Sequence, residues 1–351
     1  MNFVVTGGGS GGHIFPALAV AQHLQNRGHR VAYVGGSGGM EERLVPEVGV
    51  EFFALPAGKY NRGSLQPREA VKAAKGLLAA RRLLGRLRPD AVLTTGGFAG
   101  FPFAFVAELS RIPVVILEQN ATLGLANRWL APRSRRIALA FASNLPERYR
   151  NKQVVTGMPV REKSFPTAQA RAELGFDPNK PLLLIMGGSQ GSLALNQLLP
   201  DLLRPWLAQG WQVLHQTGKA GYDETAARVA GWSGYQARDF VDAPLAWSAA
   251  TAAVTRAGAT TLAEAAYHAV PLLALPLPAR IDGGAQESNA RFYASRGAAL
   301  VANQDEPETV AAALAELANE SVRKQLQDSL ERLSPAGATE RLAKILQEVA
   351  G

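Results

Sequence analysis

The sequence of 351 residues contains no cysteine. A disulfide framework and a thiolate metal site are therefore excluded, and the cytoplasm is the expected compartment. No run of about 18 uninterrupted apolar residues occurs, so no membrane-spanning helix is expected. The first residues lack a basic segment followed by a long apolar one, so export is not expected either.

Acidic residues are also few. The 29 aspartates and glutamates stand against 37 lysines and arginines, which gives a formal net charge of +8 and a sequence pI near 9.9. This excess favours an anionic partner, which could be nucleic acid, an acidic membrane or a phosphorylated ligand. Charge alone does not choose among them. The length predicts two domains of roughly 150–170 residues each.

The N-terminal stretch predicts a strand, a glycine loop and a helix. Residues 2–6 form a short β-branched and aromatic run, and the loop Gly7–Gly12 leads through His13 into a helical pattern. The loop matches the dinucleotide fingerprint G-x-G-x-x-G, whose glycines let the backbone approach a phosphate. That fingerprint also requires an acidic residue at the end of the second strand, where this sequence has Gly35-Gly36. An NAD site is therefore not expected.

Strands and helices alternate through the rest of the chain, which predicts parallel sheets. Further strands are expected at residues 91–95, 114–117, 137–140 and 154–157, and, in the second half, at residues 182–186, 213–216, 238–241, 252–255 and 272–275. Each half opens with a strand that enters a glycine loop. We expect an α/β protein with two Rossmann-like domains and a cleft between them, whose ligands bind at the carboxyl ends of the strands.

The stretch Arg256–Asn289 has the pattern of a nucleotide-sugar pocket. The segment Gly258–Thr260 follows an apolar strand, so its backbone N–H groups would form a helix N-terminus, where anions bind. Glu264 follows about one helical turn later on the same face and could bind a ribose. Gln286 and Asn289 share a helix face and could bind the hydroxyls of a sugar.

Residues 66–88 form a basic amphipathic pattern. Against the single acid Glu69, the cations are Arg68, Lys72, Lys75, Arg81, Arg82, Arg86 and Arg88. A solvated face of a crossover helix explains this pattern, and so does docking on anionic lipid, to which each surface cation contributes about 1 kcal/mol. Nucleic acid could use the same charge, but no recognised binding motif or aromatic stacking platform accompanies it. No nucleic-acid partner is expected.

Several of these motifs together resemble those of the MurG family of bacterial GlcNAc transferases. The resemblance rests on R-x-G-x-x-x-x-x-E and Q-x-x-N at 256–289, GGSGGHIFP at 8–16, EQN with a later Asn at 118–127, GMPVR at 157–161 and GGSQG at 187–191. It covers nearly the whole chain and implies a GT-B glycosyltransferase. Residues 1–157 with about 336–351 would form the acceptor and membrane-binding domain, and residues 158–335 the UDP-GlcNAc donor domain.

The resemblance also implies roles for particular residues. His13 or Glu118 would be the catalytic base, and the positive end of the helix would keep His13 neutral by lowering its pKa. The residues expected to bind the donor are Ser10, Gly11, Gly12, Asn120, Arg161, Gly188, Ser189, Gln190, Val241, Gly258, Ala259, Thr260, Glu264, Gln286 and Asn289. Those expected on the acceptor side are Gly97, Phe98 and Asn127. Taken singly, several of them could instead cap a helix or pack in the core.

Three positions depart from the family pattern. Leu117 replaces a histidine, Phe98 a frequent tyrosine and Ala285 a usually polar residue. The first weakens a role for a second histidine and leaves Glu118 as the alternative base. Phe98 makes an acceptor contact through a phenol hydroxyl less expected, and Ala285 does the same for one contact with the donor sugar.

The reaction implied is inverting transfer of GlcNAc from UDP-GlcNAc to the C4 hydroxyl of MurNAc in lipid I, a lipid-linked MurNAc-pentapeptide. The products would be lipid II and UDP, formed by a peripheral protein at the cytoplasmic side of the cell membrane. No Asp-x-Asp pair occurs, so neither an obligatory metal nor another cofactor is expected. The alternatives are another UDP-sugar enzyme of the same fold, such as a UDP-GlcNAc 2-epimerase, and a non-catalytic UDP-sugar-binding protein.

Overall fold

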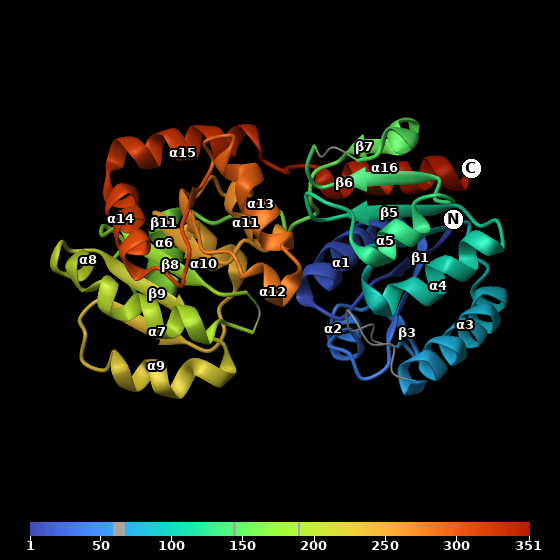
Figure 1. The fold of residues 1–351 in the computed structure, drawn as a ribbon, viewed down its shortest axis with the longest axis horizontal. Coiled ribbons are helices and arrows are strands. Elements are labelled where there is room, and N and C mark those ends of the chain that lie inside the picture. Colours follow the sequence, from blue (N-terminus) through green and yellow to red (C-terminus); the bar gives the residue numbers. More distant parts are fainter. Residues whose placement is uncertain (59–66, 143–144, 189) are drawn as a thin grey trace. The chain divides into compact units, whose positions relative to one another are not determined.

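The computed structural model describes residues 1–58, 67–142, 145–188 and 190–351. The chain divides into two compact units. Unit 1 consists of Met1–Val160 and Pro335–Gly351, and unit 2 of Arg161–Ser334. Each unit is a parallel sheet with helices packed around it (Figure 1), so the α/β class predicted from the alternating pattern is confirmed.

Within the described residues, the sheet of unit 1 has seven strands in the order β3-β2-β1-β4-β5-β6-β7. Their bounds are β1 Asn2–Thr6, β2 Arg30–Gly36, β3 Glu51–Leu55, β4 Ala91–Thr94, β5 Val114–Glu118, β6 Arg136–Leu139 and β7 Gln153–Val155. The central strand β1 pairs with a neighbour on each side, Val4 lying opposite Ala32 in β2 and Val92 in β4. The chain leaves β1 toward β2 on one side and returns to β4 on the other. The loops after β1 and β4 therefore flank the switch point at the carboxyl edge, the usual ligand position in such sheets.

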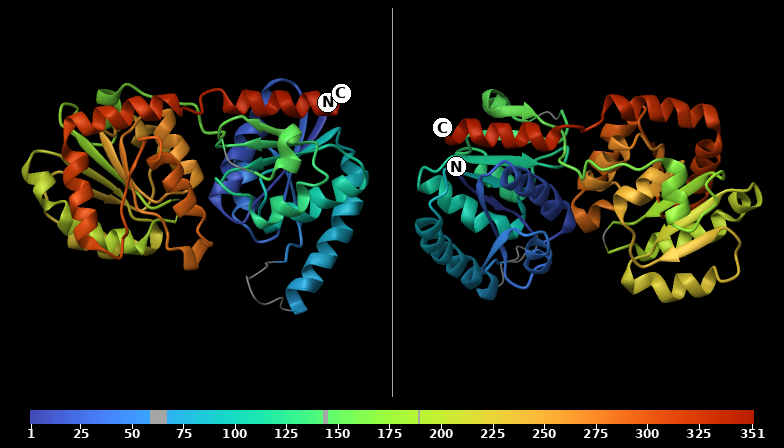
Figure 2. Two further views of the ribbon diagram at one scale, coloured as in Figure 1. Left: turned by 45° about the horizontal axis from the view of Figure 1, so that its top comes forward. Right: turned by 180° about the vertical axis from the view of Figure 1, so that it is seen from behind.

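The helices of unit 1 cover a core of aliphatic strand residues. They are α1 Gly11–Asn26, α2 Glu41–Glu47, α3 Pro67–Leu87, α4 Gly97–Leu109, α5 Leu125–Leu130, the short 3₁₀ helix η1 Glu147–Lys152, and α16 Ala338–Ala350. The last of these brings the C-terminal segment back to pack on α1 (Figure 2). Arg27 pairs with Glu340 at 2.8 Å across this contact, and the side-chain amide of Gln347 lies 2.7 Å from a ring nitrogen of His29.

In the described part of unit 2, the sheet has six strands in the order β10-β9-β8-β11-β12-β13. Their bounds are β8 Leu182–Met186, β9 Gln212–Gln216, β10 Tyr235–Arg238, β11 Ala252–Thr255, β12 Leu272–Ala274 and β13 Leu300–Val301. The direction of winding reverses between β8 and β11. The loops after these two strands, which carry the second glycine loop and the Gly258–Thr260 turn, therefore meet at the carboxyl edge.

The helices of unit 2 enclose a core that includes Trp206 and Trp211, whose rings lie edge to face at 4.5 Å. They are α6 Thr167–Glu173, α7 Leu193–Leu202, α8 Arg204–Ala208, η2 Lys219–Gly221, α9 Tyr222–Arg228, α10 Ala243–Ala249, α11 Ala259–Tyr267, α12 Ala279–Asp282, α13 Ala285–Ala294, α14 Pro307–Ala318 and α15 Glu320–Arg332. None of the helices in the described ranges combines the length and apolar character needed to cross a bilayer.

One strand prediction is wrong. A strand was expected at residues 238–241, but β10 ends at Arg238 and pairs with β9 through Tyr235–Arg238. Val241 therefore lies in the loop that follows. The strands β3 and β13 were not expected, because the first is an edge strand and the second has only two residues.

Candidate active site

His13 lies in the first turn of α1, directly after the glycine loop that follows β1. Its Nδ1 atom lies 2.7 Å from the backbone oxygen of Thr95, which follows β4. A carbonyl can only accept, so Nδ1 carries the proton and the neutral ring presents its lone pair at Nε2. The side-chain nitrogen of Gln119 lies 3.3 Å from the same carbonyl and 3.1 Å from Nδ1. Nδ1–H and the Gln119 amide are both donors, so they share the Thr95 carbonyl as acceptor. Neither Thr95 nor Gln119 was predicted from the sequence, although each is the first residue after a strand.

The pKa of His13 is lowered, in the predicted direction. Burial is the largest effect, because the charged ring loses its hydration. The hydrogen bond to Thr95 and the carboxylates of Glu118 and Glu41 act in the opposite direction. The imidazole is therefore neutral at neutral pH, with Nε2 available as a base.

Glu118 ends β5 and is 1% exposed. Its Oε1 accepts hydrogen bonds from the backbone N–H of Asn120 at 3.0 Å and from the Asn120 side chain at 3.4 Å. Its Oε2 accepts from the backbone N–H of Gly124 at 2.9 Å and from the Asn127 side chain at 2.9 Å. Both oxygens thus hold the loop after β5. Glu118, the predicted alternative base, therefore already has a hydrogen-bond donor at each oxygen. The Leu117 side chain beside it is fully buried in the core.

The predicted acceptor-side residues have different surroundings. Asn127 is 3% exposed and bonded to Glu118, so it supports the loop and presents no surface to a ligand, a correction to the prediction. Gly97 begins α4 with φ +76°, and a Cβ there would lie 2.5 Å from the oxygen of Gly8. Only glycine allows these two loops to approach so closely. The ring of Phe98 lies against Gly9 of the same loop.

Three residues predicted to bind the donor also lie at the start of α1. Ser10 is exposed at the N-cap position, where its backbone oxygen accepts from His13 N at 3.1 Å while its side chain caps nothing. Gly11 and Gly12 form the first turn of the helix. Asn120, the fourth unit 1 residue with this prediction, has its side chain bonded to Glu118. All four belong to unit 1.

In unit 2, the turn that the sequence predicts to bind an anion follows β11. Gly258 is the N-cap of α11, which begins at Ala259. Among the described residues, no protein acceptor takes a hydrogen bond from the backbone N–H groups of Gly258, Ala259 and Thr260. The hydroxyl oxygen of Thr260 is buried and likewise has no partner there. Backbone donors without a protein acceptor at a helix N-terminus suit a phosphate.

Glu264 lies one turn further along α11 and is partly buried. Burial raises the pKa of its carboxyl to about 7, while the nearby charge of Arg161 and a hydrogen bond from Trp247 lower it. The indole N–H of Trp247 donates to Oε2 at 3.2 Å. Arg161 also pairs with Asp242 at 3.3 Å. A carboxylate and a guanidinium group therefore lie near the anion site, a suitable arrangement for a ribose diphosphate.

Gln286 and Asn289, the predicted sugar-binding pair on α13, both contact the loop after β11. The side-chain oxygen of Gln286 accepts from the backbone N–H groups of Ala257 at 3.2 Å and Leu277 at 3.1 Å. This leaves its side-chain NH₂ group for a ligand. Asn289 is fully buried and donates to the oxygen of Ala257 at 3.2 Å. The prediction of a direct sugar contact by Asn289 is therefore corrected to a supporting role.

The second glycine loop follows β8. Gly188 accepts a hydrogen bond from the Gln216 side chain at 3.0 Å, and Gln190 follows in the turn. Ser189, predicted to meet the donor, lies outside the described residues. Val241 is 6% exposed, so only its backbone could face a base.

Arg256 joins this loop to the neighbouring strand ends. It is 4% exposed and donates to the Ser192 hydroxyl at 2.8 Å and to the oxygen of Leu275 at 2.9 Å. The sequence placed Arg256 in the motif but did not indicate this role.

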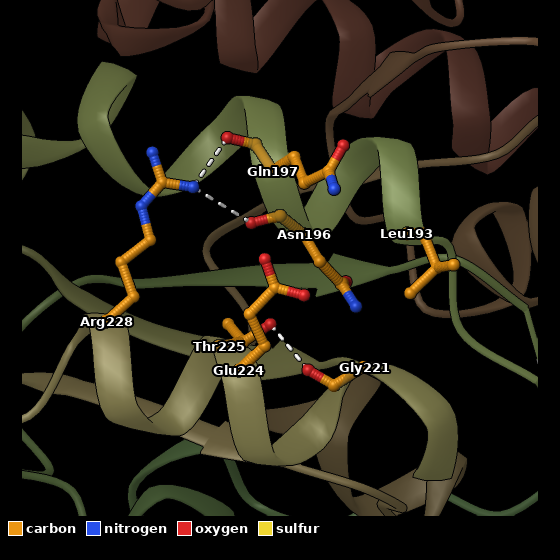
Figure 3. Close-up of a pocket in the computed structure, with 7 residues that line it drawn as sticks. All are labelled: Leu193, Asn196, Gln197, Gly221, Glu224, Thr225 and Arg228. Atoms are coloured by element: carbon orange, nitrogen blue, oxygen red, sulfur yellow. Dashed lines mark hydrogen bonds between the residues drawn. The ribbon is translucent and has the colours of Figure 1, made fainter.

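A small hollow lies between α7 and α9 (Figure 3). Arg228 donates to the backbone oxygen of Gln197 at 2.7 Å on one side, and Thr225 to that of Gly221 at 2.7 Å on the other. The volume of about 10 Å³ holds roughly one water molecule. It is too small for a nucleotide sugar, and none of the predicted site residues lines it.

Comparison with known proteins gives matches over both units. The N-terminal domain of glycosyltransferase family 28 matches residues 3–139, and the C-terminal domain of that family matches residues 182–349. The chain is 48% identical over 345 residues to a UDP-N-acetylglucosamine–N-acetylmuramyl-(pentapeptide) pyrophosphoryl-undecaprenol N-acetylglucosamine transferase of Thermus thermophilus, covering 98% of each chain. A protein of the same name from Deinococcus radiodurans is 38% identical over 378 residues, covering 98% of this chain and 94% of its own.

Solved structures agree with these matches. MurG of Acinetobacter baumannii has a TM-score of 0.78 at 30% identity, covering 99% of this chain and 100% of its own. A UDP-GlcNAc 2-epimerase from Neisseria meningitidis has a TM-score of 0.71 at 13% identity, covering 99% and 100%. The second likeness shows a shared fold alone.

Proposed function

This chain belongs to glycosyltransferase family 28, and on that premise we propose that it transfers GlcNAc from UDP-GlcNAc to the C4 hydroxyl of MurNAc in a lipid-linked MurNAc-pentapeptide. The products are UDP and the GlcNAc-bearing lipid used in peptidoglycan synthesis. The names of the relatives from Thermus and Deinococcus state this activity. The observation that carries the chemistry is the hydrogen bond between His13 Nδ1 and Thr95, which leaves a basic nitrogen at a sheet switch point.

The acceptor hydroxyl gives its proton to Nε2 of His13 as its oxygen bonds to C1 of GlcNAc. The bond from C1 to the phosphate oxygen breaks, the configuration at C1 inverts, and UDP leaves. His13 suits the role of base because burial keeps its ring neutral. Glu118 suits it less, because both of its oxygens already accept hydrogen bonds.

Unit 2 supplies the donor contacts in this proposal. The free N–H groups of Gly258–Thr260 bind the diphosphate and stabilise the charge that develops on UDP, together with Arg161. Glu264 accepts hydrogen bonds from the ribose, the loop at Val241 meets the uracil, and the Gln286 side-chain NH₂ group meets the sugar. No step requires a metal, so chelator in the assay leaves turnover in place.

We assign peripheral membrane association at the cytoplasmic face to α3. The described residues of this helix begin at Pro67, so Gln66 of the predicted pattern lies outside them. Leu84 and Leu87 face the core, whereas Val71 and Leu78 are 54% and 62% exposed. These two are separated by about two helical turns, with exposed Lys75 between them. An exposed apolar and cationic face suits an anionic lipid surface, where the acceptor resides.

The test is transfer of labelled GlcNAc from UDP-GlcNAc to a short-chain lipid I analogue by the purified protein, with water alone as the control acceptor. Label in the lipid product supports donor, acceptor and reaction together. His13→Ala should lower kcat by about 10²- to 10⁴-fold with UDP binding unchanged. UDP-GlcNAc consumed without acceptor would instead indicate a 2-epimerase, and binding without turnover would indicate a non-catalytic protein.

A further inference from the structure

Glu41 is a charged side chain to which the mechanism above gives no role. It is the first residue of α2 and is 1% exposed. In the part of the chain that the structure describes, no lysine, arginine or histidine forms an ion pair with it. Burying a carboxylate without a cation is costly, so the question is what its position provides.

The carboxylate lies against the glycine loop that leads to His13. Gly36 donates its backbone N–H to Oε1 at 3.0 Å, and Gly9 donates to Oε2 at 3.5 Å. A Cβ on Gly8 would lie 2.2 Å from Oε1, and one on Gly39 would lie 2.5 Å from Oε2. Both glycines thus leave the space that the carboxylate occupies, and Glu41 in turn holds the loop.

Two carboxylates act on the His13 ring through space, Glu118 from β5 and Glu41 from α2, and both favour its protonated form. Neither β4 nor the first turn of α4 carries an ionisable side chain. From β2, the Tyr33 hydroxyl donates to the oxygen of Gly7 at 3.1 Å.

The ion pair of α1 with α16, Arg27 to Glu340, lies at the far end of α1. The two carboxylates whose charges act on His13 also differ in surroundings. Among the described residues, Glu118 accepts four hydrogen bonds, whereas Glu41 accepts two, one of them long. Glu118 has the larger effect on the pKa of His13 and Glu41 the smaller one.

We propose that Glu41 is a positioning residue for the transfer. It fixes the Gly7–Gly9 turn that leads to His13, and its negative charge acts on the ring, which gains a proton as the acceptor hydroxyl attacks. A fixed charge in a buried site stabilises the imidazolium form without reorganising during the reaction. This inference rests on the proposed function of His13 as the base.

The test is the Glu41→Gln variant, which keeps the shape and an acceptor oxygen but removes the charge. The readout is the pKa of His13, followed by NMR on protein labelled in its five histidines, with His13→Ala for assignment. Removing the negative charge should lower the pKa of His13, because Glu41 favours the protonated ring. The kcat should fall about tenfold, with the KM for UDP-GlcNAc within about twofold of wild type.

Glu42→Gln is the matched control, because Glu42 is the next residue, is exposed, and accepts from Gly38 N at 2.7 Å. It should change neither the His13 titration nor kcat. If Glu41→Gln does not fold, Glu41→Asp moves the charge one methylene away and should lower the pKa of His13 in the same direction by less.

An unchanged His13 titration in the folded variant would overturn the inference, even if the rate fell, because a merely structural role lowers the rate alone. The titration needs no turnover. A wild-type protein that transfers no GlcNAc would therefore count against the proposed function. The titration would still show whether Glu41 changes the pKa of His13.

Discussion

Trp247 donates its indole N–H to the Oε2 atom of Glu264 across 3.2 Å, a hydrogen bond that joins α10 to α11. Trp247 is 1% exposed. The pKa of Glu264 lies at about 7, so its carboxyl changes protonation state near neutral pH. Only the ionised form accepts hydrogen bonds at both oxygens, so the ribose contact in our proposal depends on pH.

The variant Trp247→Phe tests this relationship. Losing the indole N–H removes a contact that lowers the pKa of Glu264, so the pKa should rise. In wild type, UDP affinity should increase from pH 6 to pH 8 as Glu264 ionises. In the variant this increase should move to higher pH, leaving affinity at pH 7 lower by about two- to fivefold. Calorimetric titration of UDP at several pH values measures the affinity, with Trp232→Phe as the control. Identical pH profiles of affinity in wild type and Trp247→Phe would refute the role of Trp247.

Glu118 should matter for stability more than for proton transfer. Glu118→Ala leaves the Gly124 N–H and the Asn127 side chain without their buried acceptor. We expect unfolding free energy to fall by about 2–4 kcal/mol in urea titrations at pH 7. Glu173→Ala, at an exposed position on α6, should change it by less than about 0.5 kcal/mol. Full stability combined with complete loss of transfer would instead restore Glu118 as the base.

The exposed face of α3 should control lipid binding. Replacing both Lys75 and Arg82 with alanine removes two surface cations worth about 1 kcal/mol each, so partition onto anionic vesicles should fall roughly 30-fold. Sedimentation with vesicles containing acidic lipids measures this, and neutral vesicles should bind little of either protein. The double variant of Arg204 and Lys324 in unit 2 removes the same charge and should bind like wild type. Equal loss in both double variants would show that net charge, not α3, drives binding.

Glu108 should make the stability of unit 1 pH-dependent. Both carboxylate oxygens are buried and, among the described residues, have no hydrogen-bond partner. Burial raises the pKa of Glu108 to about 8, against the opposing charges of Arg133 and Lys152. Because the folded pKa exceeds the unfolded value of about 4.3, stability is full below that value and falls as pH rises to about 8.

The measurement is urea unfolding of wild type and Glu108→Gln at pH 5 and pH 8. The variant cannot ionise, so its stability relative to wild type should increase with pH by at most about 1.4 kcal/mol per unit. Glu173→Gln serves as the control, since its carboxylate is exposed. A constant difference between Glu108→Gln and wild type would show that Glu108 stays ionised in the folded protein.

Features that depend on neighbouring residues could be predicted from the sequence. The strands β1, β8 and β11 have the predicted bounds, because a short β-branched or apolar run ending in glycine specifies a strand and its turn locally. The same local logic placed His13 after the first loop and the Gly258–Thr260 turn at the start of α11. The family motifs, which occur in the expected order along the chain, predicted the glycosyltransferase fold.

The tertiary structure alone decided which of these loops meet. The partner of His13 is Thr95, 82 residues away, and it is brought there because β4 pairs with β1 rather than with β3. Strand order also placed Glu41 against the glycine loop. The burial of Asn127 and Asn289 followed from packing, since a polar residue at helical spacing can face a ligand or brace a loop equally well. The pairing of distant strands and the burial of side chains are properties of the whole fold. The motifs specify only which residues lie near one another in the sequence.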